Sequence, residues 1–385
     1  MICLHALIFA VLAGTFIGLG VNLLFFTSLV SGAQAGSHGR VSVLVPARDE
    51  ERAIGECVSS LIAQDYPDIE VLVLDDCSAD GTARIVGDLL KGTRHRLIAG
   101  APLPEGWMGK NWACHQLSEV ATGEWLLFTD ADTVHAPGAL SAAISLAVVE
   151  RADLLSAWPR LMTLTLGEKM VIPILHIMAL GWFPIAGLRF LQEHPRLAAL
   201  LPAKTLRVCG GANGQFMLFR RGAYERIGGH AAVRDHIVED VVLGREIARR
   251  IPEGMRLLNC DASRLIDCRM YHSFREVWKG FTKNARSVFE DGVVMWYLVG
   301  GLQFIGFFLP FVLLCFPSQF RPAAIEVGMI YLLRVIMTAR MRTSWAGCLL
   351  HPAGHFLAMA IGIWSWINTA GAGVEWKGRK YRPSR

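Results

Sequence analysis

Acidic side chains recur in three short groups along the chain: Asp75-Asp76, Asp130-Ala131-Asp132 and Glu239-Asp240. The middle group directly follows an apolar run, WLLFT at 125–129. In a buried strand, such an end leaves the core and faces a crevice. If the backbone stays extended, Asp130 and Asp132 point to the same side. Two oxygen ligands placed in this way suit Mg²⁺ or Mn²⁺, with positions left for water and substrate phosphates.

The transfer of a sugar from a nucleotide donor requires a set of three such acidic sites. One carboxylate holds the base or ribose, and a second group holds the metal that bridges the diphosphate. The third takes a proton from the attacking hydroxyl, so it must lie within hydrogen-bond reach of the acceptor. The metal neutralises the nucleoside diphosphate as it departs.

Each group also has a purely structural interpretation. An Asp-X-Asp alone is more often a solvated turn, and Asp75-Asp76 with Gly81 is compatible with an Asx turn and a helix cap. Glu239-Asp240 suits the positive end of a helix dipole, which would lower a carboxylate pKa unless burial or neighbouring acids raise it. Lys110 is most often a solvated lysine in such a position, although it can also reach a phosphate. The acidic groups predict a site only jointly.

The elements that position these groups alternate between strand and helix. The sequence predicts strands at 41–45, 69–74, 96–99, 125–129 and 214–219, and helices at 54–62, from Thr82, at 110–120, at 221–227 and from 238 through 247. The first strand is expected to stop at Pro46. Such alternation implies a parallel, doubly wound sheet with ligands at the carboxyl ends of its strands. Asp76, Asp130 and Asp132 fall at those ends.

Composition indicates a membrane protein without a nucleic-acid partner. Of 385 residues, 53% are hydrophobic, and the mean hydropathy is +0.38. The formal net charge of +5 comes without a dense Lys/Arg run. The 9 cysteines form no Cys-X-X-Cys pair, so neither a zinc knuckle nor a disulfide framework is indicated. A reducing cytosolic face fits this pattern best.

Residues 2–30 contain no Lys, Arg, Asp or Glu and are long enough to cross a bilayer. A cleaved signal peptide is the alternative, with Ala33-Gln34-Ala35 as its cleavage site, but the usual positively charged start is missing. The first arginines follow this span, which favours a cytoplasmic location for what comes next. We therefore expect an uncleaved anchor at 1–36 and a catalytic domain at 37–292.

Further apolar spans lie at 296–316, 323–337 and 345–369, within a C-terminal membrane region at 293–385. Three full crossings would leave the basic tail 377–380 outside, so we expect one re-entrant segment, with 323–337 as the first candidate. The stretch at about 165–191 is apolar but interrupted by prolines and an arginine, and is expected to lie along the bilayer surface. The amphipathic segment 271–290 fits either the membrane surface or a helix packed on the domain.

The motifs resemble those of family-2 glycosyltransferases with the GT-A fold. The carriers are VSVLVPARDE at 41–50, LDDCSADGT at 74–82, TDADT at 129–133 and VED at 238–240. A narrower resemblance, to membrane-anchored enzymes that glycosylate bacterial carotenoid acids and hopene-associated lipids, rests on LPEGWMGKN at 103–111, VHAP at 134–137, GFTKN at 280–284 and WKGRKY at 376–381. The resemblance implies an α/β GT-A domain with a doubly wound, Rossmann-like mixed sheet, plus transmembrane helices at both ends of the chain.

It also implies roles for single residues. Nucleotide or donor contacts fall to Pro46, Glu50, Asp75, Asp76, Lys110 and Asp130; Mg²⁺ or Mn²⁺ falls to Asp130 and Asp132; and the base of a single inverting displacement falls to Asp240, beside Glu239. The Gln-X-X-Arg-Trp element of the family's processive synthases is not found, which argues for the addition of one sugar.

We thus expect transfer of one hexose from a UDP-sugar to a hydroxyl or carboxyl of a hydrophobic terpenoid or other lipid, at the cytoplasmic side of the inner membrane by a multi-pass protein. A carboxylate acceptor would not need a general base. The alternatives are transfer to a polyprenyl phosphate, a diacylglycerol or a ceramide-type lipid, or a non-catalytic nucleotide-sugar sensor or scaffold. A dinucleotide-dependent oxidoreductase is disfavoured, because no G-X-G-X-X-G follows the first strand.

Overall fold

A mixed seven-stranded sheet organises the part of the chain that carries the acidic groups. Its order is β3-β2-β1-β4-β8-β6-β9, and its strands are β1 (Val41–Ala47), β2 (Ile69–Asp75), β3 (Arg96–Ala99), β4 (Trp125–Thr129), β6 (Leu154–Trp158), β8 (Phe216–Arg220) and β9 (Leu257–Asp261). Because β1 pairs in parallel with both β2 and β4, the carboxyl ends of these three strands share one edge. β8 runs antiparallel to β4 and β6, so the mixed α/β sheet is confirmed and an all-parallel sheet is not.

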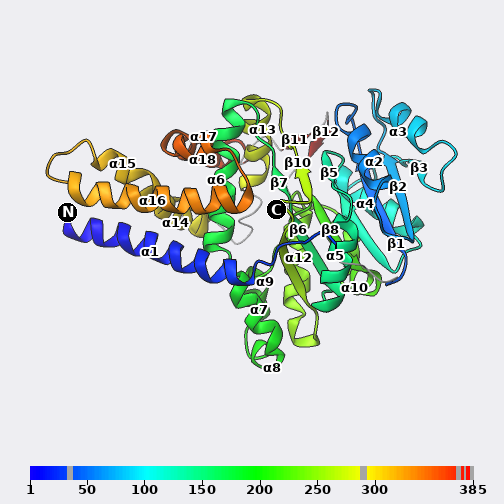
Figure 1. The fold of residues 1–385 in the computed structure, drawn as a ribbon, viewed down its shortest axis with the longest axis horizontal. Coiled ribbons are helices and arrows are strands. Elements are labelled where there is room, and N and C mark those ends of the chain that lie inside the picture. The colour runs from blue at the N-terminus through cyan, green and yellow to red at the C-terminus, as the bar shows by residue number, and fades with distance from the viewer. Residues whose placement is uncertain (33–37, 287–292, 370–373, 377–378, 382–385) are drawn as a thin grey trace. The chain divides into compact units, whose positions relative to one another are not determined.

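The computed structural model describes residues 1–32, 38–286, 293–369, 374–376 and 379–381 (Figure 1). These residues divide into two units, each described by itself below. The sheet belongs to the unit formed by 26–160, 187–268 and 376–385, called the sheet unit here. The remaining residues, 1–25, 161–186 and 269–375, form the helical unit. The alternative cleavage site at 33–35, the end of the segment 271–290, and Lys377-Gly378 of the basic tail lie outside the described residues.

Helices cover both faces of the sheet. One apolar core contains Val43 of β1 with Ile54 and Val86 from the helices, and the other contains Leu44 with Leu117 and Leu243. Neighbouring residues of β1 therefore face opposite cores, as the two-residue repeat of a strand requires. The first core takes α2 (Ile54–Ile62), α3 (Thr82–Leu90) and α5 (Ala139–Val149), and the second takes α4 (Gly109–Val120), α10 (Arg221–Arg226) and α12 (Glu239–Arg249).

Shorter elements complete the sheet unit. They are β5 (Thr133–His135), β7 (Arg160–Leu161), β10 (Ile266–Cys268), α7 (Ile185–Glu193), α8 (Pro195–Ala198), α9 (Ala203–Val208), α11 (Gly229–Ala232), a 3₁₀ turn (Ile251–Glu253), β11 (Val374–Trp376) and β12 (Arg379–Tyr381), of which α7, β7 and β11 straddle the boundary between the units. β5 pairs antiparallel with β10, directly after the middle acidic group.

Two local expectations are wrong. β1 does not stop at Pro46 but continues to Ala47, with Pro46 opposite Leu74 of β2. Its pairing with β4 reaches only Leu44, so a residue without an N–H is tolerated beyond that point. The backbone also does not stay extended through Asp130 and Asp132: it turns, and the Thr133 N–H donates to the Asp130 carbonyl at 3.3 Å.

The helical unit contains most of the long apolar helices. Its elements are α1 (Ile2–Phe25), α6 (Leu166–Trp182), α13 (Phe274–Ala285), α14 (Val293–Gln303), a π-helical turn (Phe304–Phe308), α15 (Leu309–Leu313), α16 (Phe320–Met341), α17 (Trp345–Leu349) and α18 (His351–Thr369). Among the described residues, four helical stretches are long and apolar enough to cross a membrane: Ile2–Phe25, Leu166–Glu193, Val294–Leu313 and Phe320–Met341.

Small residues let these helices approach closely. A Cβ added at Gly18 of α1 would lie 2.4 Å from the carbonyl oxygen of Gly181 in α6, and one added at Gly354 of α18 would lie 2.1 Å from the carbonyl oxygen of Met170. Contacts of this kind are typical of helices in membranes, where close packing, and not the hydrophobic effect, holds helices together. α6 therefore packs against α1 and α18, and the surface orientation expected for 165–191 stays a prediction.

The segment expected to be re-entrant forms one unbroken helix. α16 runs through all of 323–337 without a break. Its buried charges have partners within the helical unit: Glu326 pairs with His5 at 2.7 Å, and Arg334 donates to the Gly347 carbonyl at 2.6 Å. Such pairing explains how two ionisable residues fit in an apolar helix.

Candidate functional site

Lys110 joins two of the three acidic groups. It lies in the first turn of α4, and its Nζ is 2.7 Å from Asp130 Oδ1, just after β4, and 2.9 Å from Glu239 Oε1, at the start of α12. Burial lowers the pKa of Lys110, but Asp130 and Glu239 more than offset this and raise it well above its usual value. The lysine is therefore a fixed positive charge between two carboxylates, not a solvated side chain.

Asp240 is held beside this ion pair. Its Oδ2 accepts a hydrogen bond from the Gly214 N–H, and its Oδ1 accepts one from the Val241 N–H, both at 2.8 Å. Burial, and then the charge of Glu239, raise the pKa of Asp240 to about 6, against Lys110 and the two N–H donors, which lower it. A carboxylate with such a pKa is a useful general base near neutral pH.

Gly214 is part of this arrangement, although sequence reasoning placed it only at the start of the predicted strand 214–219 and not in the site. A Cβ at this position would lie 3.0 Å from Asp240 Oδ2 and 3.3 Å from Lys110 Nζ. Because β8 is antiparallel, the start of β8, next to Gly214, lies at the same edge as the end of β4. The reversed strand thus brings the Gly214 N–H to Asp240.

The surroundings of Asp132 disfavour the charged form of its carboxylate. Its carboxylate is partly buried, and Cys268 Sγ of β10 donates to its Oδ1 at 3.5 Å. Burial, followed by the charges of Asp130 and Glu50, raises its pKa to about 7. A divalent cation would relieve this accumulation of negative charge.

The donor set fits a hard divalent metal held by two carboxylates. Asp130 and Asp132 supply oxygen ligands, and no group of three or more His, Cys, Asp or Glu suited to a metal occurs among the described residues. Mg²⁺ is often bound in this way, by one or two carboxylates with substrate phosphates and water completing the shell. Asp130 already pairs with Lys110, so that lysine would share the carboxylate with the ion.

Asp75 ends β2 at the same sheet edge, and Asp76 follows it directly. Asp75 Oδ1 is buried and has no hydrogen-bond partner in the described structure, so an acceptor is available for a ligand. The Asp76 carboxylate is instead bound by Arg379 of β12, and its carbonyl accepts a hydrogen bond from Arg48 Nη1 at 2.5 Å. Neither arginine was singled out from the sequence as a site residue.

Of the remaining two predicted residues, Pro46 lies in β1 and Glu50 lies in the loop that follows it. Pro46 is within the strand, opposite Leu74 of β2. The Glu50 N–H donates to Thr82 Oγ1 at 2.8 Å, and its charge reaches Asp132. Asp49 and Cys77 adopt positive φ angles of 50° and 56° in the loops that follow β1 and β2. Such backbone strain in non-glycine residues is concentrated at functional sites.

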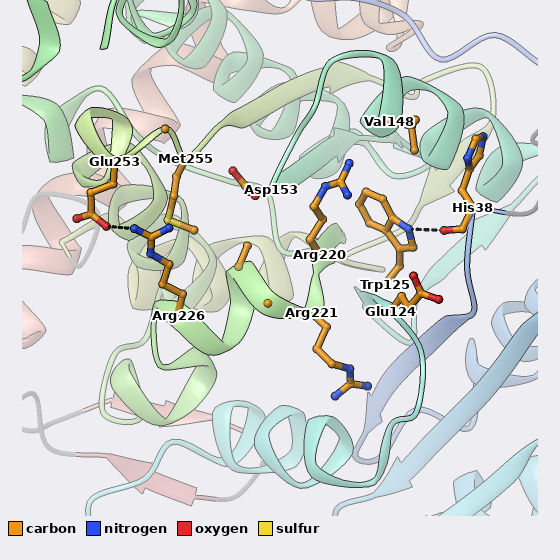
Figure 2. A pocket seen from close by; sticks show the side chains of 13 residues that line it. His38, Glu124, Trp125, Val148, Asp153, Arg220, Arg221, Arg226, Glu253 and Met255 are labelled. Carbon is orange, nitrogen blue, oxygen red and sulfur yellow. Dashed lines mark hydrogen bonds and ion pairs between the residues drawn. The ribbon is translucent and has the colours of Figure 1, made fainter. Parts of the chain in front are cut away.

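A pocket of about 720 Å³ lies at the opposite end of β4 (Figure 2). Trp125, where β4 begins, lines it together with Arg220 and Arg226, and none of the predicted site residues does. Figure 2 shows Arg226 paired with Glu253, at 2.6 Å, and the Trp125 indole N–H donating to the His38 carbonyl. The arginines of this pocket thus make contacts within the protein, such as that of Arg220 over the Trp125 ring.

The sequence is similar to a known protein family and to a characterised relative. Residues 42–228 match the model described as Glycosyl transferase family 2. The chain is 24% identical over 375 residues to the 4,4'-diaponeurosporenoate glycosyltransferase of Staphylococcus aureus (strain USA300), covering 91% of this chain and 90% of that protein.

Solved structures give weaker likenesses. A mannosyltransferase from Pyrobaculum calidifontis in complex with GDP-Man and Mn²⁺ is 19% identical, with a TM-score of 0.48 over 96% of this chain and 99% of that one. A glucosyl-3-phosphoglycerate synthase from Mycobacterium tuberculosis, with Mn²⁺, UDP and glucosyl-3-phosphoglycerate, is 18% identical, with a TM-score of 0.40 over 67% and 81%. At TM-scores this low, neither likeness supports an argument about this chain.

Proposed function

Because residues 42–228 belong to glycosyltransferase family 2, we propose that the protein transfers a single hexose from a UDP-sugar to a hydrophobic, terpenoid-type acceptor at a membrane. The observation that carries the proposal is the cluster in which Lys110 joins Asp130 to Glu239 while Asp240 is held beside them. The proposed class of acceptor is based on the name of the Staphylococcus aureus relative, and the proposed membrane location is based on the long apolar helices.

In the proposed reaction, Asp240 takes the proton of the acceptor hydroxyl while the acceptor oxygen attacks the anomeric carbon. The bond from that carbon to the diphosphate oxygen breaks, UDP leaves with the electron pair, and the configuration at the carbon is inverted. Asp75 and Asp76 would hold the nucleoside. Asp130 and Asp132 would hold Mg²⁺ or Mn²⁺, which when bound neutralises the charge of the departing diphosphate.

The acceptor group decides how much Asp240 matters. The first word of the relative's name, 4,4'-diaponeurosporenoate, ends in "-oate", which denotes a carboxylate, and a carboxylate acceptor has no proton to remove at neutral pH. We expect Asp240→Asn to leave UDP binding intact and to abolish transfer to a hydroxyl acceptor, while transfer to a carboxylate acceptor persists. Undiminished transfer to a hydroxyl would rule out Asp240 as the base.

The test of the whole proposal is UDP release by the purified full chain. The reaction would contain a panel of UDP-sugars, Mg²⁺ or Mn²⁺, and extracted bacterial lipids, including carotenoid acids. An Asp130→Ala/Asp132→Ala variant serves as the matched control. Lipid-stimulated release that the control lacks identifies the donor. Metal-dependent UDP binding without any release would instead favour a nucleotide-sugar sensor.

A further inference from the structure

The C-terminal strand of the chain reaches the carboxylate proposed to bind the nucleoside. Arg379 of β12 donates from Nη1 to Asp76 Oδ2 at 2.6 Å and from Nη2 to Asp76 Oδ1 at 3.0 Å. The two residues are 303 positions apart, yet both belong to the sheet unit. The contact is therefore a defined tertiary interaction within one unit.

The geometry is that of a strong, orienting ion pair. Both carboxylate oxygens are engaged by the two terminal nitrogens of one guanidinium, the bidentate arrangement that fixes the plane of a carboxylate. The side chains of Arg379 and Asp76 are only 19% and 5% exposed, so water screens the pair poorly. A surface ion pair would contribute little, but this one restricts the orientation of a buried acid.

The surroundings suit an anionic ligand. Arg48 Nη1 lies 3.9 Å from Asp76 Oδ2, so two arginines accompany one carboxylate. Next to them, Asp75 Oδ1 is buried without a hydrogen-bond partner, which leaves an acceptor for an N–H or O–H of a ligand. Positive charge beside an open acceptor matches a nucleoside that carries a diphosphate.

We propose that Arg379 is a positioning residue of the donor site, which fixes the Asp76 carboxylate for the nucleoside of the UDP-sugar. This inference rests on the proposed function, and it makes the C-terminal segment part of the catalytic unit. Arg379 acts through Asp76 before the chemical step, so its loss should affect donor binding and leave the bound donor's reactivity nearly unchanged.

The experiment compares full-length variants in UDP titrations and in donor-dependent kinetics. We expect Arg379→Ala to raise the Kd for UDP and the KM for the donor about tenfold while kcat changes less than about twofold, because one orienting charge-assisted pair is lost. In an Asp76→Asn background, the same substitution should add no further loss, since its target is gone. Arg196→Ala, at an exposed arginine of α8, is the matched control and should bind UDP as the wild type does.

Each result has one meaning. UDP affinity that is unchanged or tighter in Arg379→Ala overturns the inference, as does a tenfold effect that persists in the Asp76→Asn background. If Arg379→Ala does not fold, Arg379→Lys replaces it, and a donor KM equal to that of the wild type then overturns the inference, because lysine cannot form the bidentate pair. Failure of the wild type itself to bind UDP would instead contradict the proposed function.

Discussion

Two opposing sets of influences act on the pKa of Asp240, which lies in the first turn of α12. Lys110, its two N–H donors and its place in the first turn of α12 stabilise the charged form, whereas burial and Glu239 destabilise it. The second pair of influences prevails, since the pKa of Asp240 rises from 3.8 to about 6. Asp240 thus has a pKa suited to a base, although it lies in the first turn of a helix.

The pH dependence of the rate follows from that pKa. A base acts only when deprotonated, so kcat for a hydroxyl acceptor should be flat above about pH 7 and fall about tenfold per pH unit well below pH 6. A carboxylate at its usual pKa would keep the plateau down to about pH 5. Stopped assays of UDP release between pH 4.5 and 8.5, at saturating donor, measure the midpoint. A plateau extending to pH 5 would contradict an elevated pKa at the base.

Asp132 is the residue on which metal dependence should rest. Asp132→Asn removes a charge that is strained by burial, Asp130 and Glu50, so the protein should fold at least as stably while losing metal-dependent UDP binding. UDP titrations with and without Mn²⁺ measure the loss, which we expect to be at least tenfold. Asp88→Asn, at an acid of α3 with a side chain 75% exposed, is the control. Wild-type affinity in Asp132→Asn would refute the metal assignment.

At this scale, sequence reasoning located acids better than cations. Asp76 and Asp130 could be placed at one edge because the carboxyl ends of neighbouring parallel strands meet there. The partners of Lys110 depend on where α12 lies, and Arg379 meets Asp76 across 303 positions. No local periodicity encodes such contacts, so they became visible only in the folded chain.

Among the elements, α12 is the one whose placement matters most for chemistry. It packs against the backbone at 210–212 through glycines: a Cβ at Gly244 would lie 2.6 Å from the Gly211 carbonyl carbon, and one at Gly210 would lie 2.5 Å from Ala248 Cβ. The first turn of the same helix carries Glu239 and Asp240. The position of α12 therefore determines the position of the candidate base, Asp240.

Gly244→Ala should accordingly act on both stability and rate. The added methyl forces α12 away from the 210–212 backbone, which we expect to cost about 1–3 kcal/mol of unfolding free energy and to lower transfer at least tenfold as Asp240 shifts. Thermal unfolding and UDP release measure the two effects. Gly222→Ala in α10, where a Cβ would meet nothing within 4 Å, should change neither. Full activity of Gly244→Ala would show that the helix tolerates the shift.

The elements predicted from the sequence were located to within a few residues, but strands β6 and β9 were not predicted, and neither was the direction of β8. Buried strands and amphipathic helices leave a two- or 3.6-residue repeat in the sequence, which located β2, β3, β4 and α2. Strand direction depends instead on how the chain returns to the sheet, and the segment between β7 and β8 carries α6 to α9. Because this connection is long, the local sequence pattern does not determine that β8 enters the sheet antiparallel to β4.

The whole molecule could be attached to a membrane by two kinds of contact, which differ in their sensitivity to salt. Helices such as α1 and α16 would bind a membrane by burial of apolar surface, an attachment that salt does not weaken. The aromatic and basic residues of α13, such as Trp278 and Lys279, would bind anionic lipid partly by charge, which salt screens within about 10 Å at 0.1 M. The composition of the long helices predicts that the first kind dominates.

Membrane fractionation decides between them. Because the four long apolar stretches carry few charges, the full chain should stay in the membrane pellet after washes with 1 M salt and alkaline carbonate, and should be released only by detergent. The Asp130→Ala/Asp132→Ala variant is the control and should fractionate identically, since its changes lie in the sheet unit. Release by salt alone would mean that attachment is electrostatic and that the long helices pack within the protein instead of in lipid.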